Sequence, residues 1–303
     1  MPTGPDLRAI AWEMKSAQDH AFQLDPLTSR YDNFDLAAAY EVAHLIHEAR
    51  CAEGAIPIGR KIGFTNPDMW EVYGVRAPIW GYMYNTTVVH VPNGRSTCSL
   101  QSFVEPKIEP EIIFCFGSAP PLDKGIDAIL ESVDWVAHGF EIVQSHFPGW
   151  QFRAPDTVAD CSLHGTLFVG DPQPTSKLHE DLIEKLASFS IALICDSTIR
   201  EEGRGSNVLG SPLIAIARLI EALGKQARHS PLQAGEVVTT GTITTAQPIR
   251  AGETWSTRLS GIELPGFELD YAVNGSLTWS PPSRLLQSQF SCFGSAALQF
   301  QLG

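Results

Sequence analysis

One ten-residue segment, Lys107–Phe116, constrains the fold of this 303-residue chain more than any other. Side chains of a β-strand alternate between its two faces, so Lys107, Glu109 and Glu111 share one face if this segment is a strand. The opposite face is apolar and carries Ile108, Ile112, Phe114 and Phe116. We therefore expect a strand that buries one face in a core and presents two carboxylates on the other.

Two carboxylates this close repel each other unless a cation or a proton lies between them. A third carboxylate, Glu141, stands near the end of a second apolar segment, Trp135–Val143. Mg²⁺ and Mn²⁺ prefer oxygen ligands, so Glu109, Glu111 and Glu141 are the candidate ligands of one such ion. The alternative is a solvated polar face, with Lys107 as the counter-charge.

Two neighbours of these carboxylates carry further expectations. Pro110 lies between the two glutamates, and proline cannot donate a hydrogen bond to a central strand, so we expect a bulge or a sheet edge there. His138 lies on the opposite face of its strand from Glu141. We therefore expect His138 to be a core or surface histidine and not a ligand.

The order of the expected elements favours the α+β class. Helical patterns cover residues 5–22 and 35–53, and from Ile56 onward the chain becomes short strand-like segments separated by Gly, Pro and Asn. Two further helices are expected at Leu178–Ser188 and Pro212–Leu223, and two late strand regions at Val237–Thr245 and Gly261–Val273.

Composition excludes several classes of protein. The formal charge is 21 − 34 = −13, and no cluster of Lys and Arg provides the basic face that nucleic-acid binding requires. The six cysteines form no C-x-x-C pair, which is typical of core thiols in a reducing compartment. Residues 1–10 lack the apolar stretch of a signal peptide, and the uncharged run after Arg284 is too polar to span a membrane. We expect a cytoplasmic protein without a nucleic-acid or membrane partner.

The two carboxylate segments, taken with four other blocks, resemble the fumarylacetoacetate hydrolase superfamily, in its branch of 2-keto-4-pentenoate hydratases and 4-oxalocrotonate decarboxylases. The blocks follow the family's order between about residues 35 and 275. They are Gly59–Thr65 (G-x-K-x-G-x-T), Pro78–Gly81 (P-x-x-G), Glu109–Glu111 (E-x-E), Glu141–Val143 (E-I-V), Asp156–Asp160 (D-T-V-A-D) and Thr240–Thr242 (T-G-T).

The resemblance implies a mixed β-roll core, a bound Mg²⁺ or Mn²⁺ ion, 2-keto acid substrates from aromatic catabolism and a homo-oligomer. It also suggests a division of the chain into three parts. Residues 1–80 would be a mainly helical region packed on the core, residues 81–280 the β-rich catalytic core, and residues 281–303 a tail that is disordered or packs on a partner.

Three departures from the family pattern leave the substrate and the reaction open. Ile79 stands where the P-x-x-G turn often carries an acidic residue, Gln144 where the E-I-V segment is often followed by Asp, and Cys161 where Asn often follows the D-T-V-A-D stretch. None of these departures touches the three candidate metal ligands.

The resemblance also directs attention to Lys61 as a proton donor or acceptor, or as an anchor for the substrate carboxylate. In a strand, Gly59 and Gly63 share its face and leave a gap through which a ligand could approach. Partial burial would lower the pKa of Lys61. The alternative is an ordinary edge-strand lysine, while Arg60 on the opposite face is expected to be structural or a surface charge.

Four further residues complete the candidate site. Thr242 and Ser162 are candidates for binding the substrate, and Asp156 and Asp160 are candidates for catalysis, for example by holding a water molecule. Each has a structural alternative: Thr242 lies in a threonine-rich segment of high β-propensity, and the two aspartates lie in a stretch that could be a structural turn.

These residues favour a lyase, because a metal-bound 2-keto acid can stabilise an enolate. The first expectation is a hydratase that adds water to a 2-hydroxy-2,4-dienoate and yields a 4-hydroxy-2-keto acid. A 4-oxalocrotonate-type decarboxylase follows, then a hydrolase of the carbon–carbon bond of an acylpyruvate. A non-catalytic subunit of a partner enzyme is the non-enzymatic alternative, against which the intact glutamates and Lys61 argue.

Overall fold

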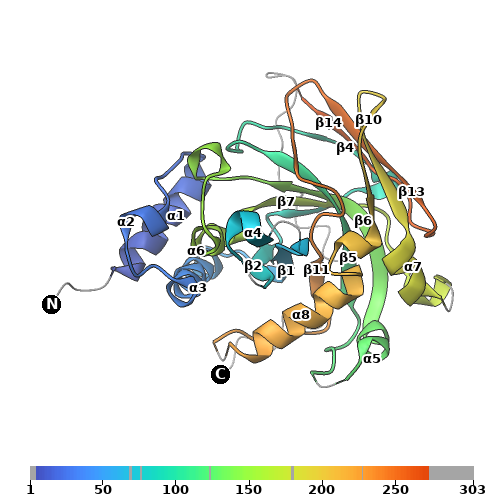
Figure 1. Cartoon of the computed structure of the whole chain (residues 1–303), viewed down its shortest axis with the longest axis horizontal. Helices are drawn as coiled ribbons and strands as arrows, with labels where there is room; N and C mark the ends of the chain where they lie inside the picture. Colours follow the sequence, from blue (N-terminus) through green and yellow to red (C-terminus); the bar gives the residue numbers. More distant parts are fainter. Residues whose placement is uncertain are drawn as a thin grey trace.

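A computed structural model describes residues 5–67, 70–75, 77–122, 124–178, 181–226 and 228–272. The expected tail at residues 281–303 lies outside the described residues, as does Cys292. Figure 1 shows helices near the N-terminus at one end of the molecule, and the β-strands, with further helices beside them, in the rest of it.

Three helices form the N-terminal part: α1 (Leu7–His20), α2 (Leu27–Arg30) and α3 (Leu36–Ala52). Aspartates cap the first and third, because Asp6 accepts from the amides of Arg8 and Ala9, and Asp35 accepts from Ala38. These helices pack with α6 (Ala154–Ala159) around a common apolar cluster. The expected N-terminal helices are therefore present.

The large sheet is mixed, with strand order β2-β1-β11-β5-β6-β7-β3, while β12 adds to β5 and β8 adds to β6. The pairs β1–β11 and β3–β7 are parallel, and the other pairs are antiparallel. The strands are β1 (Pro57–Gly63), β2 (Ile79–Tyr84), β3 (Val88–His90), β5 (Lys107–Phe116), β6 (Val133–Val143), β7 (His164–Val169), β8 (Gln173–Pro174), β11 (Val237–Thr239) and β12 (Gln247–Pro248).

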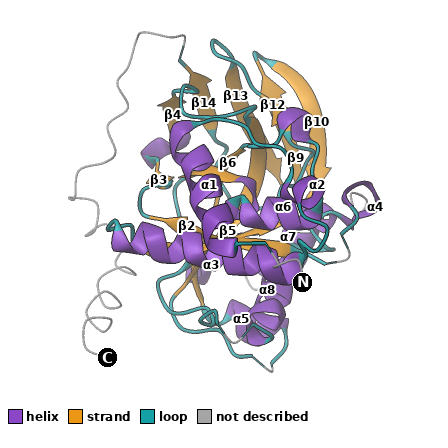
Figure 2. Ribbon diagram, turned by 90° about the vertical axis from the view of Figure 1, so that its left-hand side faces the viewer, coloured by secondary structure: helices purple, strands orange, loops and turns teal. Residues whose placement is uncertain are grey.

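A second sheet has the order β10-β9-β13-β14-β4 and lies over one end of the first (Figure 2). Its strands are β4 (Arg95–Cys98), β9 (Ser190–Cys195), β10 (Thr198–Arg204), β13 (Thr254–Ser260) and β14 (Glu268–Tyr271). The remaining helices are α4 (Trp70–Tyr73), α5 (Ile126–Leu130), α7 (Leu182–Ser188) and α8 (Pro212–Gly224).

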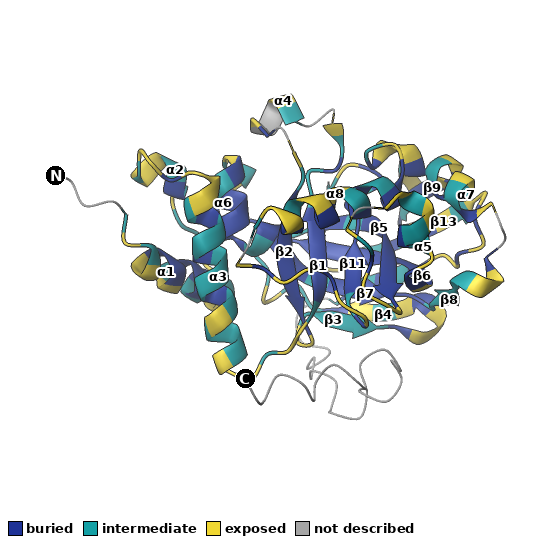
Figure 3. Ribbon diagram, turned by 90° about the horizontal axis from the view of Figure 1, so that it is seen from below, coloured by how far each residue is buried: buried dark blue, intermediate teal, exposed yellow. Residues whose placement is uncertain are grey.

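The strands β1, β2, β5, β6 and β11 are largely buried on both faces, as the dark ribbons in Figure 3 show. The face that carries Ile112 and Phe114 packs against α7 and α8. Farther along the same face, Ile108 and Phe140 pack against residues of the second sheet such as Trp255 and Leu269. The other face of β5 combines apolar residues with the two glutamates, so the alternation expected for this strand is confirmed.

Pro110 lies at a gap in the ladder and not at a bulge. The pairing of β5 with β6 runs without a register shift from Lys107 to Cys115. On its other side, β5 pairs with β12 at residues 107–108 and with β11 at residues 113–115. The carbonyl of Pro110 accepts from Ile243 on this side, and the N and C=O of one strand residue point the same way, so its missing N–H also faces the gap. The expected edge is therefore local, and the expected bulge at Pro110 is absent.

The α+β class and the mixed, curled sheet with N-terminal helices are confirmed by this topology. The division at residue 80 stays a prediction, and β1, which precedes it, pairs within the large sheet. Within the described residues, one stretch, Gly205–Gly224, is long and apolar enough to cross a membrane by length and composition alone. Half of it is buried, and α8 within it contributes Leu213, Ile216, Leu219, Ile220 and Leu223 to the core.

Asp156 ties the N-terminal helices to α6. Its fully buried carboxylate accepts from the amide and hydroxyl of Thr28, at 2.8 and 2.7 Å, and from the amide of Arg153 at 2.8 Å. The bond to Arg153 caps the first turn of α6, and the bonds to Thr28 hold α2 against it. These contacts are those of a structural residue, which was the alternative expected for Asp156.

We expect Asp156→Ala to lower the free energy of unfolding by about 2–4 kcal/mol, because it removes three hydrogen bonds to a buried carboxylate, one of them a helix cap. Urea unfolding followed by circular dichroism measures this change. Asp35→Ala removes an exposed cap of α3 and is expected to cost only about 1 kcal/mol. Equal losses in the two variants would contradict this role of Asp156.

Candidate metal centre

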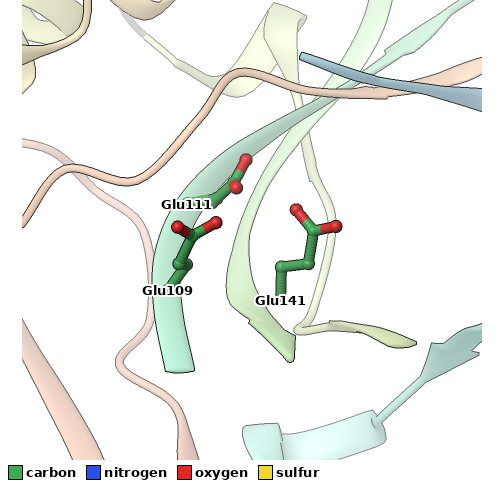
Figure 4. Close-up of side chains that lie close together, drawn as sticks. All are labelled: Glu109, Glu111 and Glu141. Atoms are coloured by element: carbon green, nitrogen blue, oxygen red, sulfur yellow. The ribbon is translucent and has the colours of Figure 1, made fainter. Parts of the chain in front are cut away.

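Three glutamates converge from two neighbouring strands. In the antiparallel pairing of β5 with β6, Glu109 lies directly opposite Glu141, and Glu111 lies opposite Gly139. Their carboxylates point toward one another, as Figure 4 shows, and each offers one oxygen within 4.8 Å of the others. The structure thus brings together the three residues predicted as metal ligands.

The donor set fits a hard divalent cation. Glu111 and Glu141 are fully buried, and their oxygens Glu111 Oε1 and Glu141 Oε2 have no hydrogen-bond partner among the described residues. A buried, unpartnered carboxylate oxygen is costly unless a cation meets it. Oxygens held by one octahedral Mg²⁺ ion at about 2.1 Å would lie about 3.0 Å apart in cis positions and about 4.2 Å apart in trans positions, so carboxylates within 4.8 Å of one another would have to move closer to share the ion.

Glu111 is oriented by a glycine turn. Its Oε2 accepts from the amide of Gly241 at 2.7 Å. Gly241 has a φ of +91°, and a Cβ there would lie 1.9 Å from Thr65 Oγ1, so only glycine fits. The T-G-T block therefore positions a metal-ligand candidate through its backbone, a role that the sequence did not reveal.

Glu141 is oriented by a histidine that a β-bulge brings to its face. His164 Nδ1 lies 2.7 Å from Glu141 Oε1, and its Nε2 lies 2.8 Å from Thr87 Oγ1. The β6–β7 register shifts so that Val143 pairs with His164, while Glu141 pairs with Leu167. Without the extra residue, Gly165 would take this place, so the bulge turns the imidazole toward the site.

Lys61 faces the same carboxylates. Its ammonium is buried and lies 3.4 Å from Glu141 Oε1 and 3.6 Å from Glu109 Oε2. Burial alone would lower the pKa of Lys61, but the charges of Glu141, Glu109 and Glu111 outweigh it and raise the pKa above its ordinary value. The lowered pKa expected from the sequence is therefore wrong, because that expectation counted burial without the three carboxylates.

The absence of a side chain at Gly59 does not leave the gap for a ligand that we expected beside Lys61. A Cβ on Gly59 would lie 1.8 Å from the carbonyl oxygen of Val237, so the missing side chain makes room for β11 and not for a ligand. Gly81 is paired with Lys61 across β1 and β2. A Cβ there would lie 2.7 Å from the carbonyl oxygen of Cys161 and 3.2 Å from the Cβ of Ser162. The turn after Asp160 therefore approaches the site over Gly81.

The pKa values of the three glutamates are shifted in different directions. Burial and the charges of Glu141 and Glu109 raise the pKa of Glu111 well above its ordinary value, and burial also raises that of Glu109. For Glu141, burial acts in the same direction, but Lys61 and His164 outweigh it and lower the pKa to about 2. Glu141 therefore holds its negative charge most readily of the three, and Glu111 gains a proton more readily than an ordinary glutamate.

The other predicted site residues lie in two places. Thr242 Oγ1 and Ser162 Oγ are buried without a partner among the described residues, and their assignment to substrate binding stays a prediction. Asp160 accepts from His146 and Gln18, and Asp156 holds Thr28 and Arg153. The catalytic assignments of the two aspartates stay predictions, and for Asp156 the observed contacts are structural.

The turn that carries Ser162 has an unusual backbone. Cys161, Ser162 and Leu163 have φ values of 51°, 54° and 64°, in the left-handed region. This conformation costs roughly 1 kcal/mol for each residue that is not glycine, and such strain concentrates at functional sites.

His138, Arg60 and His164 also lie on or next to the strands that carry the glutamates and Lys61. His138 is buried in the core, as one of the two expected positions had it, where it donates to the carbonyl of Glu111 and lies 2.8 Å from Thr257 Oγ1. Arg60 is buried on the opposite face of β1, where it pairs with Glu236 at 2.8 Å and lies over the ring of Tyr82. The contact of His164 with Glu141 could not be predicted, because the bulge that aims the imidazole at Glu141 leaves no pattern in the sequence.

The chain is similar to known proteins of two related activities, although no protein-family model matches it. The 2-keto-4-pentenoate hydratase of Paraburkholderia phymatum is 28% identical over 257 residues, which cover 84% of this chain and 94% of the relative. The 4-oxalocrotonate decarboxylase of Pseudomonas sp. (strain CF600) is 28% identical over 262 residues, which cover 86% and 95%.

A solved structure supports the same grouping. The 4-oxalocrotonate decarboxylase of Pseudomonas putida G7, in a complex with magnesium and adipate, superposes with a TM-score of 0.79 and 25% identity. The match covers 88% of this chain and 97% of that one. The curled mixed sheet with N-terminal helices is therefore the fold of that protein as well.

The raised pKa of Glu111 predicts how a metal binds. Because a metal ligand must be deprotonated, we expect Mn²⁺ to displace the proton of Glu111, so that the affinity increases with pH, by about tenfold per pH unit for one released proton. Isothermal titration calorimetry in buffers of different ionisation enthalpy measures both the affinity and the released proton. Glu111→Gln should abolish the release, whereas the exposed Glu131→Gln should not, and an affinity independent of pH would contradict this account.

Proposed function

The chain belongs to the fumarylacetoacetate hydrolase superfamily, in the branch that contains 2-keto-4-pentenoate hydratases and 4-oxalocrotonate decarboxylases, and from that premise we propose that it is a metal-dependent hydratase. Its substrate would be a 2-hydroxy-2,4-dienoate, and its product a 4-hydroxy-2-keto acid. We further propose that it acts as a homo-oligomer in the cytoplasm.

One observation carries the proposal: three carboxylates, two of them fully buried, and a buried ammonium face one another on a single face of the large sheet. Glu109, Glu111 and Glu141 would hold Mg²⁺ or Mn²⁺. Such an ion supplies a Lewis acid for the carboxylate and the C2 oxygen of a 2-keto acid. An anionic substrate suits this arrangement, because Lys61 is the cation that lies among the carboxylates within the described residues.

Lys61 would act as a charged donor. Because its pKa is raised, it carries a proton throughout the physiological pH range and does not act as a base in the resting state. A buried ammonium can donate hydrogen bonds to the substrate carboxylate or a proton to the substrate carbon, and its positive charge favours an enolate. Of the three roles expected for Lys61, proton donor, proton acceptor and anchor of the substrate carboxylate, we retain the donor and the anchor.

Two hydroxyls without partners would bind the substrate. Ser162 Oγ lies on the turn over Gly81, and Thr242 Oγ1 follows the glycine that holds Glu111. Both are buried, and a buried hydroxyl gains most from a partner that arrives with the ligand. We assign both to the substrate's oxygens.

Decarboxylation of a 4-oxalocrotonate-like substrate is the second candidate, because relatives of both activities match this chain equally well. The same enolate would serve either reaction. Carbon–carbon bond hydrolysis and a non-catalytic role rank below hydration and decarboxylation, since the three glutamates and Lys61 are all present and suit an active lyase.

The identity of the product tests the proposed function. The purified protein with Mg²⁺ is supplied separately with 2-hydroxypenta-2,4-dienoate and with 4-oxalocrotonate, and ¹H NMR identifies the products. We expect 4-hydroxy-2-oxopentanoate from the first substrate. Turnover of the second substrate alone, with release of carbon dioxide, would make the protein a decarboxylase.

Removal of Lys61 tests its role. We expect Lys61→Met to lower turnover by about 10²–10⁴-fold, as is typical for loss of one proton-transfer group. Mn²⁺ should still bind, because the three glutamates remain. Lys225→Met, at an exposed lysine of the chain, is the matched control and should retain full turnover. Near-normal turnover in Lys61→Met would exclude Lys61 from the mechanism.

A further inference from the structure

Lys107 is a second cation on the face of β5 that carries the glutamates. It lies two residues before Glu109 in an unbroken stretch of strand, so the two side chains leave the same face roughly 6.6 Å apart. In the pairing with β6, Lys107 lies opposite Val143, in the row next to that of Glu109 and Glu141. The charges of Lys107 and Glu109 act on each other. Lys107 therefore borders the candidate metal centre.

Exposure to solvent increases along this face toward Lys107. Glu111 is fully buried, the side chain of Glu109 is 15% exposed, and Lys107 is half-buried. On the other side of Glu111, the face is closed by Ile113 and Ala137, which are paired and completely buried. A substrate whose keto acid end reaches the metal is therefore expected to extend its remaining chain toward Lys107.

An indole ring holds the ammonium of Lys107. The Nζ atom lies 3.8 Å from the centroid of the Trp150 ring, well within the reach of a cation–π interaction. Trp150 is itself fixed, because its Nε1 donates to the carbonyl of Glu105 at 3.0 Å and the amide of Gly149 donates to Glu105 Oε1 at 3.1 Å. A lysine that is ordered in this way loses less conformational freedom when it binds a ligand.

The contact between Trp150 and Glu105 joins two strained backbone positions. Their φ values are 58° and 44°, in the left-handed region that residues with a Cβ rarely adopt. Such conformations persist only where the surrounding structure fixes them, and they cluster at active sites and ligand-binding sites. The support of Lys107 therefore has the features of a functional site and not of an ordinary surface loop.

The ammonium of Lys107 has no hydrogen bond or ion pair with the described residues. The carboxylate of Glu105 accepts from Gln23 and from the loop that carries Trp150, and Glu109 faces Lys61 and the other two glutamates. With Glu109 engaged by a metal, the positive charge of Lys107 is left for another anion. A carboxylate suits it, because it accepts strong charge-assisted hydrogen bonds from an ammonium.

We propose that Lys107, held by Trp150, is a specificity-determining residue that binds a second carboxylate at the far end of the substrate. The substrate class is then a 2-hydroxy-2,4-dienoate that ends in a carboxylate, with its keto acid end at the glutamates and its far end at Lys107. An extended chain of six carbons covers the roughly 6.6 Å between the positions of Lys107 and Glu109. This inference rests on the proposed function and deepens it, and it applies to hydration and to decarboxylation alike.

A matched pair of stable ligands tests this specificity. 2-Oxohexanedioate and 2-oxohexanoate have the same chain length and the same keto acid end, and only the first has a far carboxylate. Isothermal titration calorimetry of the protein with Mg²⁺ measures both dissociation constants, in about 0.15 M salt, where charges more than about 8 Å apart are largely screened. We expect 2-oxohexanedioate to bind about 10–100-fold more tightly, the contribution of one hydrogen bond to a charged group.

Three variants and a control separate Lys107 from a general effect of charge. Lys107→Met should bring the two dissociation constants close to each other, and Lys107→Arg, which keeps a cation over the ring, should retain the preference. Trp150→Leu keeps the ammonium but releases it, and should give an intermediate preference. Lys225→Met removes the same charge at an exposed position and should retain the full preference. The midpoint of thermal unfolding shows whether each variant is folded.

The outcomes distinguish this inference from the proposed function. Equal affinities for the two acids in the unmodified protein, a preference that survives in Lys107→Met, or an equal loss in Lys225→Met would overturn the role of Lys107 and leave the proposed function intact. Binding of neither acid in the presence of Mg²⁺ would reject both. A preference that depends on Lys107, in a protein that hydrates no dienoate, would reject the hydratase and retain Lys107 as the residue that binds the far carboxylate.

Discussion

The mutual repulsion of Glu109, Glu111 and Glu141 is the constraint on which the rest of the site depends. All three lie on one face of two paired strands, and their oxygens lie within 4.8 Å of one another. Two of them are completely buried. Such a cluster needs a cation or a proton to balance it, and Lys61 provides one positive charge against three carboxylates. The arrangement therefore favours a divalent ion, and with it chemistry on an anionic, chelating substrate.

Backbone placed close to the carboxylates sets their orientation. Gly241 gives its amide to Glu111, Gly165 creates the bulge that turns His164 toward Glu141, and Gly81 admits the strained turn beside Lys61. At each position, a Cβ would lie within 3 Å of another atom. Because these glycines have no side chain, the backbone can make close contacts around the site.

The sequence predicted the parts of this site that follow from strand periodicity. The alternation in Lys107–Phe116 placed Glu109 and Glu111 on one face, and the position of Glu141 in its own strand, supported by the family resemblance, added the third ligand. What could not be predicted depends on contacts between distant segments. The pKa of Lys61 reflects three carboxylates from two other strands, and the segment Val237–Thr245 remains a strand only through Thr239, because Gly241 turns to meet Glu111. The bulge at Gly165 and the pairing of His146 with Asp160 have no periodic signature either.

The most direct test of the account is the position of the metal with a chelating analogue of the enolate. Crystals grown with Mn²⁺ and oxalate would be measured for anomalous scattering from manganese. The account predicts one strong peak bound by Glu109, Glu111 and Glu141, with both oxalate carboxylates on the ion and Lys61 beside the oxalate. A peak elsewhere, or no peak while Lys61 remains paired with Glu109 and Glu141, would contradict it.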